Sequence, residues 1–253
     1  MEYSLISFDK YNKCKNIAKQ ILRSSSYYSH RDIAKLRGPN IINSLNSKYM
    51  PNAVIYYSGN DIFVNKKHYL DYWNNMFDMN NIYLRIHNAI ELDDIFIQTV
   101  SGMTTFDSGH RPLLFLNASN NIQRMIFTLL HEFIHLHQAE HRSADYMQAL
   151  AMINLDRMSG TSYPEELQPV EDEANTVASL LVLPDSNLNK DIHNLSFNEL
   201  RDKYQISSSG LYNRLRSFFY YTKDFDEYEA NQAAYAFSIN DHKLIYYVRK
   251  HID

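Results

Sequence analysis

The sequence of 253 residues contains a single cysteine, Cys14. One thiol cannot form an internal disulfide or a metal site built from several cysteines, so we expect a reducing, cytoplasmic location. No apolar run approaches the roughly 18 residues that a membrane-spanning helix needs. The N-terminus also lacks a basic stretch followed by an apolar one, which predicts that there is no secretory signal.

An excess of charge of one sign is absent as well. The 25 Lys and Arg residues stand against 29 Asp and Glu residues, which gives a formal net charge of −4. This balance argues against a protein held on nucleic acid by bulk charge, although it leaves room for a local basic patch. Internal repeats and low-complexity linkers are absent too, and the length suffices to bury a substantial core.

The first half of the chain has weaker structural signals than the second half. Apolar residues at helical spacing predict a helix at 9–24, and Gly38-Pro39 is expected to break the chain. Further on, the patterns predict a β hairpin of 54–57 with 62–64 and a β pair of 95–100 with 113–116, with Ser101-Gly102 and Ser108-Gly109 as turns.

The second half is predicted to be mainly helical. Polar residues 117–121 precede a helical pattern that runs to about His141, and a second helix is expected at 143–158. The segment 170–183 predicts a helix that Pro184 ends. Ser196 and Glu199 have the spacing of a capping box, in which the two side chains satisfy free backbone donors at the start of a helix.

The string His131 to His135, which reads His-Glu-Phe-Ile-His, carries the strongest chemical signal. Residues four apart lie one turn apart on the same face of a helix, so both imidazoles can reach one cation. Zinc binds neutral imidazole well, and Glu132 beside the first ligand is placed to take a proton from a zinc-bound water. The alternative is a pair of core histidines and a glutamate satisfied by hydrogen bonds, which is costly for three buried ionisable groups.

A third zinc ligand must come from another segment, and the helix at 170–183 is the best candidate. Glu171 and Asn175 are four apart and share a face, so Glu171 could complete the site while Asn175 orients a ligand imidazole by a hydrogen bond. Acidic residues also favour helix N-termini through the helix dipole. Spacing alone therefore leaves Glu171 and Glu173 both open as the third ligand.

These two segments resemble the ImmA/IrrE-type metallopeptidases. Residues 124–136 are similar to the family's catalytic helix, and Glu171 to Pro184 is similar to its second motif, which begins Glu-x-x-Ala-Asn. The resemblance covers roughly residues 91–220 and assigns Glu171 as the third ligand. It departs at Ile134, where the family usually has Gly, and the larger side chain is expected to change the packing below the metal.

The resemblance implies an α+β fold of the minimal zincin, gluzincin-like type, with a small β-sheet and one Zn²⁺ per chain. His131, His135 and Glu171 would hold the ion, Asn175 would support it, and Glu132 would be the catalytic base. The implied activity is zinc-dependent cleavage of a specific regulatory protein. The expected substrate is a helix-turn-helix transcriptional repressor of a mobile element or a stress response.

The segment 196–219 resembles a helix-turn-helix, and four basic residues in it could meet phosphates: Arg201, Lys203, Arg214 and Arg216. Two short helices joined by a turn are also a common packing unit, so we do not expect direct DNA binding. The rival to the peptidase is a non-catalytic regulatory protein that binds a repressor or DNA. On the catalytic helix, His137 is expected to face outward because it is off the four-residue spacing of the ligands.

The sequence divides into three expected parts. Residues 1–90 form an N-terminal helical and β region of unassigned role, and residues 91–190 form the zinc metallopeptidase core. Residues 191–253 form a C-terminal helical segment that includes the helix-turn-helix-like unit and packs on the core.

Overall fold

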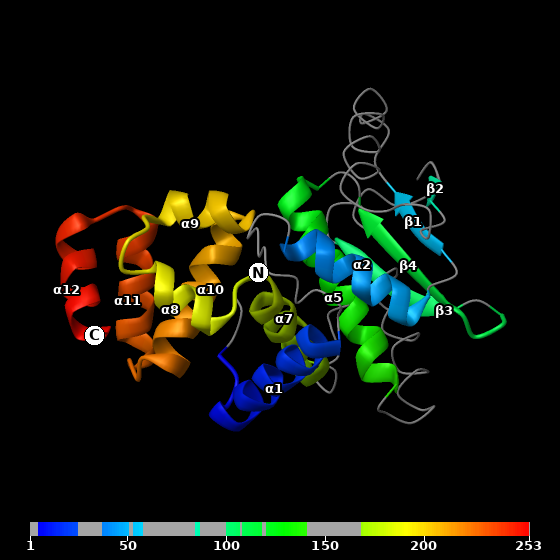
Figure 1. Ribbon diagram of the computed structural model, residues 1–253, viewed down its shortest axis with the longest axis horizontal. Coiled ribbons are helices and arrows are strands. Elements are labelled where there is room, and N and C mark those ends of the chain that lie inside the picture. Colours follow the sequence, from blue (N-terminus) through cyan, green and yellow to red (C-terminus); the bar gives the residue numbers. More distant parts are fainter. Residues whose placement is uncertain are drawn as a thin grey trace.

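The computed structural model describes residues 5–24, 37–50, 53–57, 84–86, 100–106, 108–117, 120–140 and 168–252, and every structural statement below refers to them. They form an α+β structure with a small sheet at one end and a bundle of short helices at the other (Figure 1). No helix among them is long and apolar enough to cross a membrane.

The described sheet has four strands in the order β2-β1-β4-β3. β1 (Ala53–Tyr57) pairs in parallel with β2 (Leu84–Ile86) on one side and with β4 (Pro112–Asn117) on the other. β3 (Gly102–Phe106) is antiparallel to β4. The strand predicted at 54–57 is therefore present, but both of its described neighbours are parallel strands, and its predicted hairpin partner at 62–64 lies outside the described residues.

The hairpin of β3 and β4 includes a strand that the sequence analysis did not predict. The strand predicted at 113–116 and the turn at Ser108-Gly109 are confirmed, and its antiparallel partner is the strand 102–106. Residues 95–99 of the predicted partner strand lie outside the described residues. Ser101-Gly102 is therefore no turn: the Asn117 amide donates to the Ser101 carbonyl at 2.9 Å, which continues the pairing at this end. A larger residue would not fit at Gly102, because a Cβ there would lie 2.3 Å from Cγ2 of Thr128.

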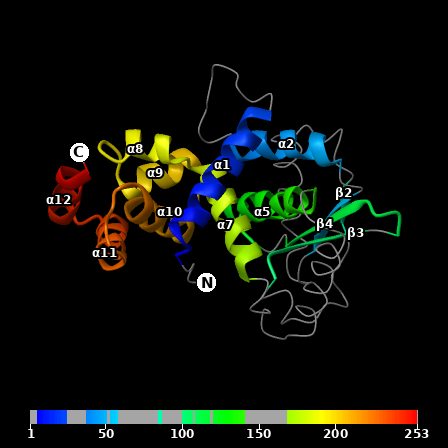
Figure 2. The same cartoon turned by 90° about the horizontal axis from the view of Figure 1, so that it is seen from below.

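α5 (Ile122–Glu140) is the central helix, in contact with α2 (Arg37–Tyr49), α7 (Gln168–Val182) and both strands of the hairpin (Figure 2). Asn121 caps α5 by accepting a hydrogen bond from the Arg124 amide at 2.9 Å. Every residue from 128 to 138 is buried, as expected for a helix covered on several sides. Ile134 is fully buried in the core.

α2 shows that the predicted break at Gly38-Pro39 is wrong, because both residues lie in its first turn. Proline is tolerated there, since the backbone N–H that it lacks would have no partner within the helix. Gly38 is explained by packing: a Cβ at this position would lie 2.6 Å from Cγ2 of Ile126, so its absence lets α2 pack closely on α5.

The C-terminal helices are α8 (Asp185–Asp191), α9 (Phe197–Tyr204), α10 (Ser208–Thr222), α11 (Glu227–Ser238) and α12 (His242–Ile252). The capping box of Ser196 and Glu199 is present as predicted, and Gln205 ends α9 in the left-handed conformation. α9 and α10 bury an apolar set that includes Leu200, Leu211 and Leu215. The segment 143–158, predicted as a helix, lies outside the described residues.

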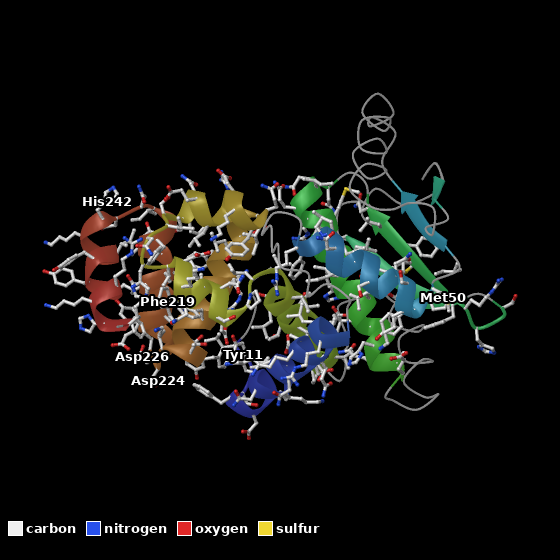
Figure 3. The ribbon with its side chains drawn as sticks, viewed as in Figure 1. Tyr11, Met50, Phe219, Asp224, Asp226 and His242 are labelled. Atoms are coloured by element: carbon white, nitrogen blue, oxygen red, sulfur yellow. The ribbon has the colours of Figure 1, made fainter. Side chains whose placement is uncertain are left out.

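α1 (Phe8–Ser24) joins the two ends of the molecule. It contacts α7 on the sheet side, and Tyr11 stacks on Tyr221 of α10 with ring centroids 3.9 Å apart. The Tyr11 hydroxyl also donates to Asp185 at 2.9 Å (Figure 3). Cys14 on the same helix is 1% exposed and belongs to the core, so α1 is an integral part of the fold.

The contact between β3 and α5 can be tested by substitution. Gly102→Ala should lower the free energy of unfolding by about 1–3 kcal/mol, because the new methyl group meets Thr128 in a tightly packed core. Thr128→Ser removes the nearest methyl group, so the double variant should lose less stability than the sum of the two single variants. Urea denaturation measures all four proteins, and simple additivity would show that the two positions are not in contact.

Candidate metal centre

α5 places two imidazoles at one point. His131 and His135 are 8% and 4% exposed, and their Nε2 atoms lie 2.9 Å apart. The two rings are nearly perpendicular, with centroids 4.6 Å apart. The one-turn spacing thus brings the same nitrogen of both rings to a common position beside the helix.

α7 adds a carboxylate to this position. Glu171 lies with Oε2 at 3.1 Å from Nε2 of His131 and with Oε1 at 3.1 Å from Nε2 of His135. Glu173, the other acid that spacing left open, is bonded instead to Gln138 and Lys13. The structure therefore brings Glu171, and not Glu173, to the two imidazoles.

The donor set fits a zinc ion in both chemistry and spacing. Two imidazole nitrogens and one carboxylate are the ligands of a catalytic zinc site that keeps a further position open. Donors spaced about 3 Å apart can all lie roughly 2.0–2.2 Å from one ion placed just outside their plane. The two Nε2 atoms lie 2.9 Å apart and each lies 3.1 Å from a different oxygen of Glu171, so the three side chains are close enough to share one ion.

The electrostatics of the three residues also favour a cation. Burial alone would lower the pKa of His135, but the adjacent Glu171 carboxylate outweighs it and raises the pKa to about 9. Burial would likewise raise the pKa of Glu171, whereas His135 and His131 hold it well below its usual range. This arrangement favours positive charge at the site, and a divalent ion could take the place of the proton.

Glu132 lies beside these residues, 3% exposed, against the first residues of β3. The Thr104 hydroxyl donates to Oε2 of Glu132 at 2.7 Å. A Cβ at Gly102 would lie 2.9 Å from Oε1 of Glu132, so a glycine is needed for this close approach. Thr104 was not identified from the sequence, because no strand was predicted at 102–106.

Gln138 is the second functional residue that the sequence analysis missed. Its Oε1 atom lies 2.9 Å from Nδ1 of His135, in a buried hydrogen bond. The spacing of three residues on a helix could have indicated it, because such residues share a face. The supporting hydrogen bond that we expected from Asn175 is thus made by Gln138.

Asn175 occupies a different place. It is half-buried on α7 and lines a pocket of about 110 Å³ between α5, α7 and α10, together with Phe127 and Ser217. Among the described residues Nδ1 of His131 has no hydrogen-bond partner, so Asn175 holds neither imidazole. Phe127 precedes His131 by one turn and Asn175 follows Glu171 by one turn, but none of the three proposed ligands lines the pocket.

His137 is buried rather than outward-facing, which corrects the expectation for this residue. It is 7% exposed, and its Nδ1 atom lies 3.0 Å from the Tyr49 hydroxyl. α2 covers this side of α5, and that packing between distant segments was not visible in the spacing of the histidines.

Comparison with known protein families indicates a class: part of the chain is similar to a peptidase-family domain. Residues 93–216, just under half of the chain, match the model of the IrrE N-terminal-like domain, peptidase family M78. This segment is therefore similar to a domain of the ImmA/IrrE type, as its two motifs indicated. The match begins after β2 and ends within α10, so α1 and α2 lie outside it. No curated protein and no solved structure matches the chain significantly.

The role of Glu171 can be tested against its neighbour on the same helix. Glu171→Gln should weaken zinc binding by more than the roughly 10–100-fold that loss of a supporting hydrogen bond costs, because a charged ligand is removed. Asp172→Asn is the matched control, since Asp172 is bonded to Gln168 and not to an imidazole. Competition with a chelating dye measures both affinities. Equal affinities for the two variants would exclude Glu171 as a ligand.

Proposed function

We propose that the protein is a zinc-dependent endopeptidase, with the ion held by His131, His135 and Glu171 and with Glu132 as the catalytic base. The observation that carries this proposal is the juxtaposition of these three donors within one peptidase-family domain. An additional carboxylate, Glu132, lies on the turn between the two histidines. A site of purely structural type would favour a fourth protein ligand and would have no need for a base.

The ion, when bound, would supply Lewis-acid activation of a water and of the scissile carbonyl. The remaining chemistry belongs to the side chains around it. Thr104 donates to one oxygen of Glu132 and so fixes the orientation of the carboxylate. In this orientation Glu132 can accept a proton from the attacking water and return it to the leaving amine. His131, Glu132 and His135 are each less than 10% exposed, which limits the access of bulk water to the reacting groups.

The substrate class follows from the family. Domains of the ImmA/IrrE type act on proteins, and the resemblance narrows the proposed substrate to a helix-turn-helix repressor of a mobile element or a stress response. In this proposal residues 91–190 form the catalytic core, residues 1–90 and 191–253 flank it, and the protein acts in the cytoplasm. The pocket that Asn175 lines lies one turn along α7 from Glu171 and is the proposed place for part of the substrate.

The rival function is a non-catalytic regulator that binds a repressor or DNA. Two of the four basic residues that could meet phosphates, Arg214 and Arg216, are 1% and 6% exposed. Lys203 is paired with Asp191, and Arg201 is paired with Asp202. A DNA-binding role would need these groups at the surface and free to contact phosphates, which favours packing as the role of α9 and α10.

The proposal is tested by Glu132→Gln, which keeps the size of the side chain and its hydrogen bond with Thr104 but removes the base. Cleavage of the repressor should fall by about two to four orders of magnitude. Zinc content and thermal stability should stay close to those of the wild type, because none of the three proposed ligands changes.

The assay is co-expression with the helix-turn-helix repressor encoded nearest to the gene, read by immunoblot. We expect repressor fragments with the wild type and intact repressor bound to the variant. If both proteins relieve repression equally and neither yields fragments, the protein acts as a binder and the peptidase proposal fails.

A further inference from the structure

A chain of hydrogen bonds runs from His135 to the surface of the protein. Nδ1 of His135 is bonded to Oε1 of Gln138, and Nε2 of Gln138 donates to Oε1 of Glu173 at 3.0 Å. The other oxygen of Glu173 accepts from Lys13 of α1 at 3.0 Å. Nε2 of Gln138 also donates to the carbonyl of Val170 at 3.1 Å. We refer to Gln138 and Glu173 together as the relay.

The relay fixes which way the Gln138 amide faces. Its NH₂ group meets two oxygens that can only accept, the Val170 carbonyl and the Glu173 carboxylate. Reversing the amide would place its oxygen against both acceptors and lose two hydrogen bonds. Oε1 must therefore face His135, and an oxygen in this position requires a proton on Nδ1 of the ring.

The protonation of Nδ1 decides what the other ring nitrogen can do. A neutral imidazole that carries its proton on Nδ1 presents the lone pair of Nε2, and Nε2 is the atom that faces His131 and Glu171. Nδ1 of His131 has no such partner among the described residues. The relay thus acts on one of the two imidazoles and not on the other.

We propose that Gln138, held in place by Glu173, is a positioning residue that sets the tautomer and ring orientation of His135 for metal binding. This inference rests on the metal site in the proposed function. It gives Glu173 a role distinct from that of a ligand. It also links α1, which lies outside the matched family segment, to His135 by hydrogen bonds that run from Lys13 through Glu173 and Gln138.

Substitutions in the relay and at Lys13 should differ in their effect on zinc affinity. Gln138 is 3% exposed, so Gln138→Leu leaves buried groups unpaired and should weaken zinc binding about 10–100-fold. Glu173→Gln keeps an acceptor for the Gln138 amide and should stay within about threefold of the wild type. Lys13 has a side chain that is 62% exposed, so Lys13→Met should change the affinity little.

A reciprocal exchange separates positioning from general packing. Gln138→Glu alone places a second carboxylate against Glu173 and should weaken zinc binding. Combined with Glu173→Gln, the new amide can donate to the new carboxylate, which still accepts from Nδ1 of His135. The double variant should therefore recover part of the affinity that the single Gln138→Glu variant loses, since the Val170 carbonyl still faces an oxygen, whereas a purely steric role would give no recovery.

The experiment is zinc titration of the metal-free full chain against a chelating dye at pH 7, for the wild type and each variant. Asp172→Leu is the control for loss of a carboxylate from α7. Nitrogen-15 NMR of the histidine rings in the zinc-loaded wild type gives a readout that needs no substitution, and it should show His135 protonated on Nδ1 and coordinated through Nε2.

The outcomes distinguish the two proposals. If the wild type binds no zinc, the proposed metal site fails and the relay fails with it. If the wild type binds zinc but Gln138→Leu binds it equally well, or His135 coordinates through Nδ1, the relay is wrong while the metal site stands. A variant that does not fold leaves the decision to the NMR measurement on the wild type.

Discussion

The structure depends on the packing of α5 against α7, which buries two imidazoles and two carboxylates in the interior. Burying several ionisable groups costs free energy unless each one finds a partner. His131, His135 and Glu171 are partners for one another, and Thr104 satisfies Glu132. The remaining elements hold this polar cluster in place: β3 closes one side of α5 and α2 closes another.

The sequence predicted those features that depend on local spacing. The helix with both histidines, the helix that follows it, the capping box at Ser196 and the turn at Ser108-Gly109 all rest on contacts within a few residues. Glu171 could be chosen over Glu173 only with the family pattern, because both lie in the first turns of one helix. The family itself was recognised from two short motifs, and the domain match agrees with them.

The features that escaped prediction depend on contacts between distant segments. The parallel pairing of β1 with β2 and β4 cannot be recognised from the sequence pattern of any single strand. Gly102 was read as a turn signal, whereas it is small because Thr128 of α5 lies against it. Gln138 is recognisable as a support for His135 only once Val170 and Glu173 are known to accept from its amide.

The burial of Cys14 in α1 limits how the protein can respond to oxidants. Burial raises the pKa of this thiol to about 12, so the reactive thiolate is essentially absent at neutral pH. The sulfur is also shielded, with the residue only 1% exposed. Since this is the one cysteine in the sequence, the folded chain has no thiol of its own that could act as a redox sensor. Oxidation of this thiol would therefore first require α1 to leave its packed position in the core.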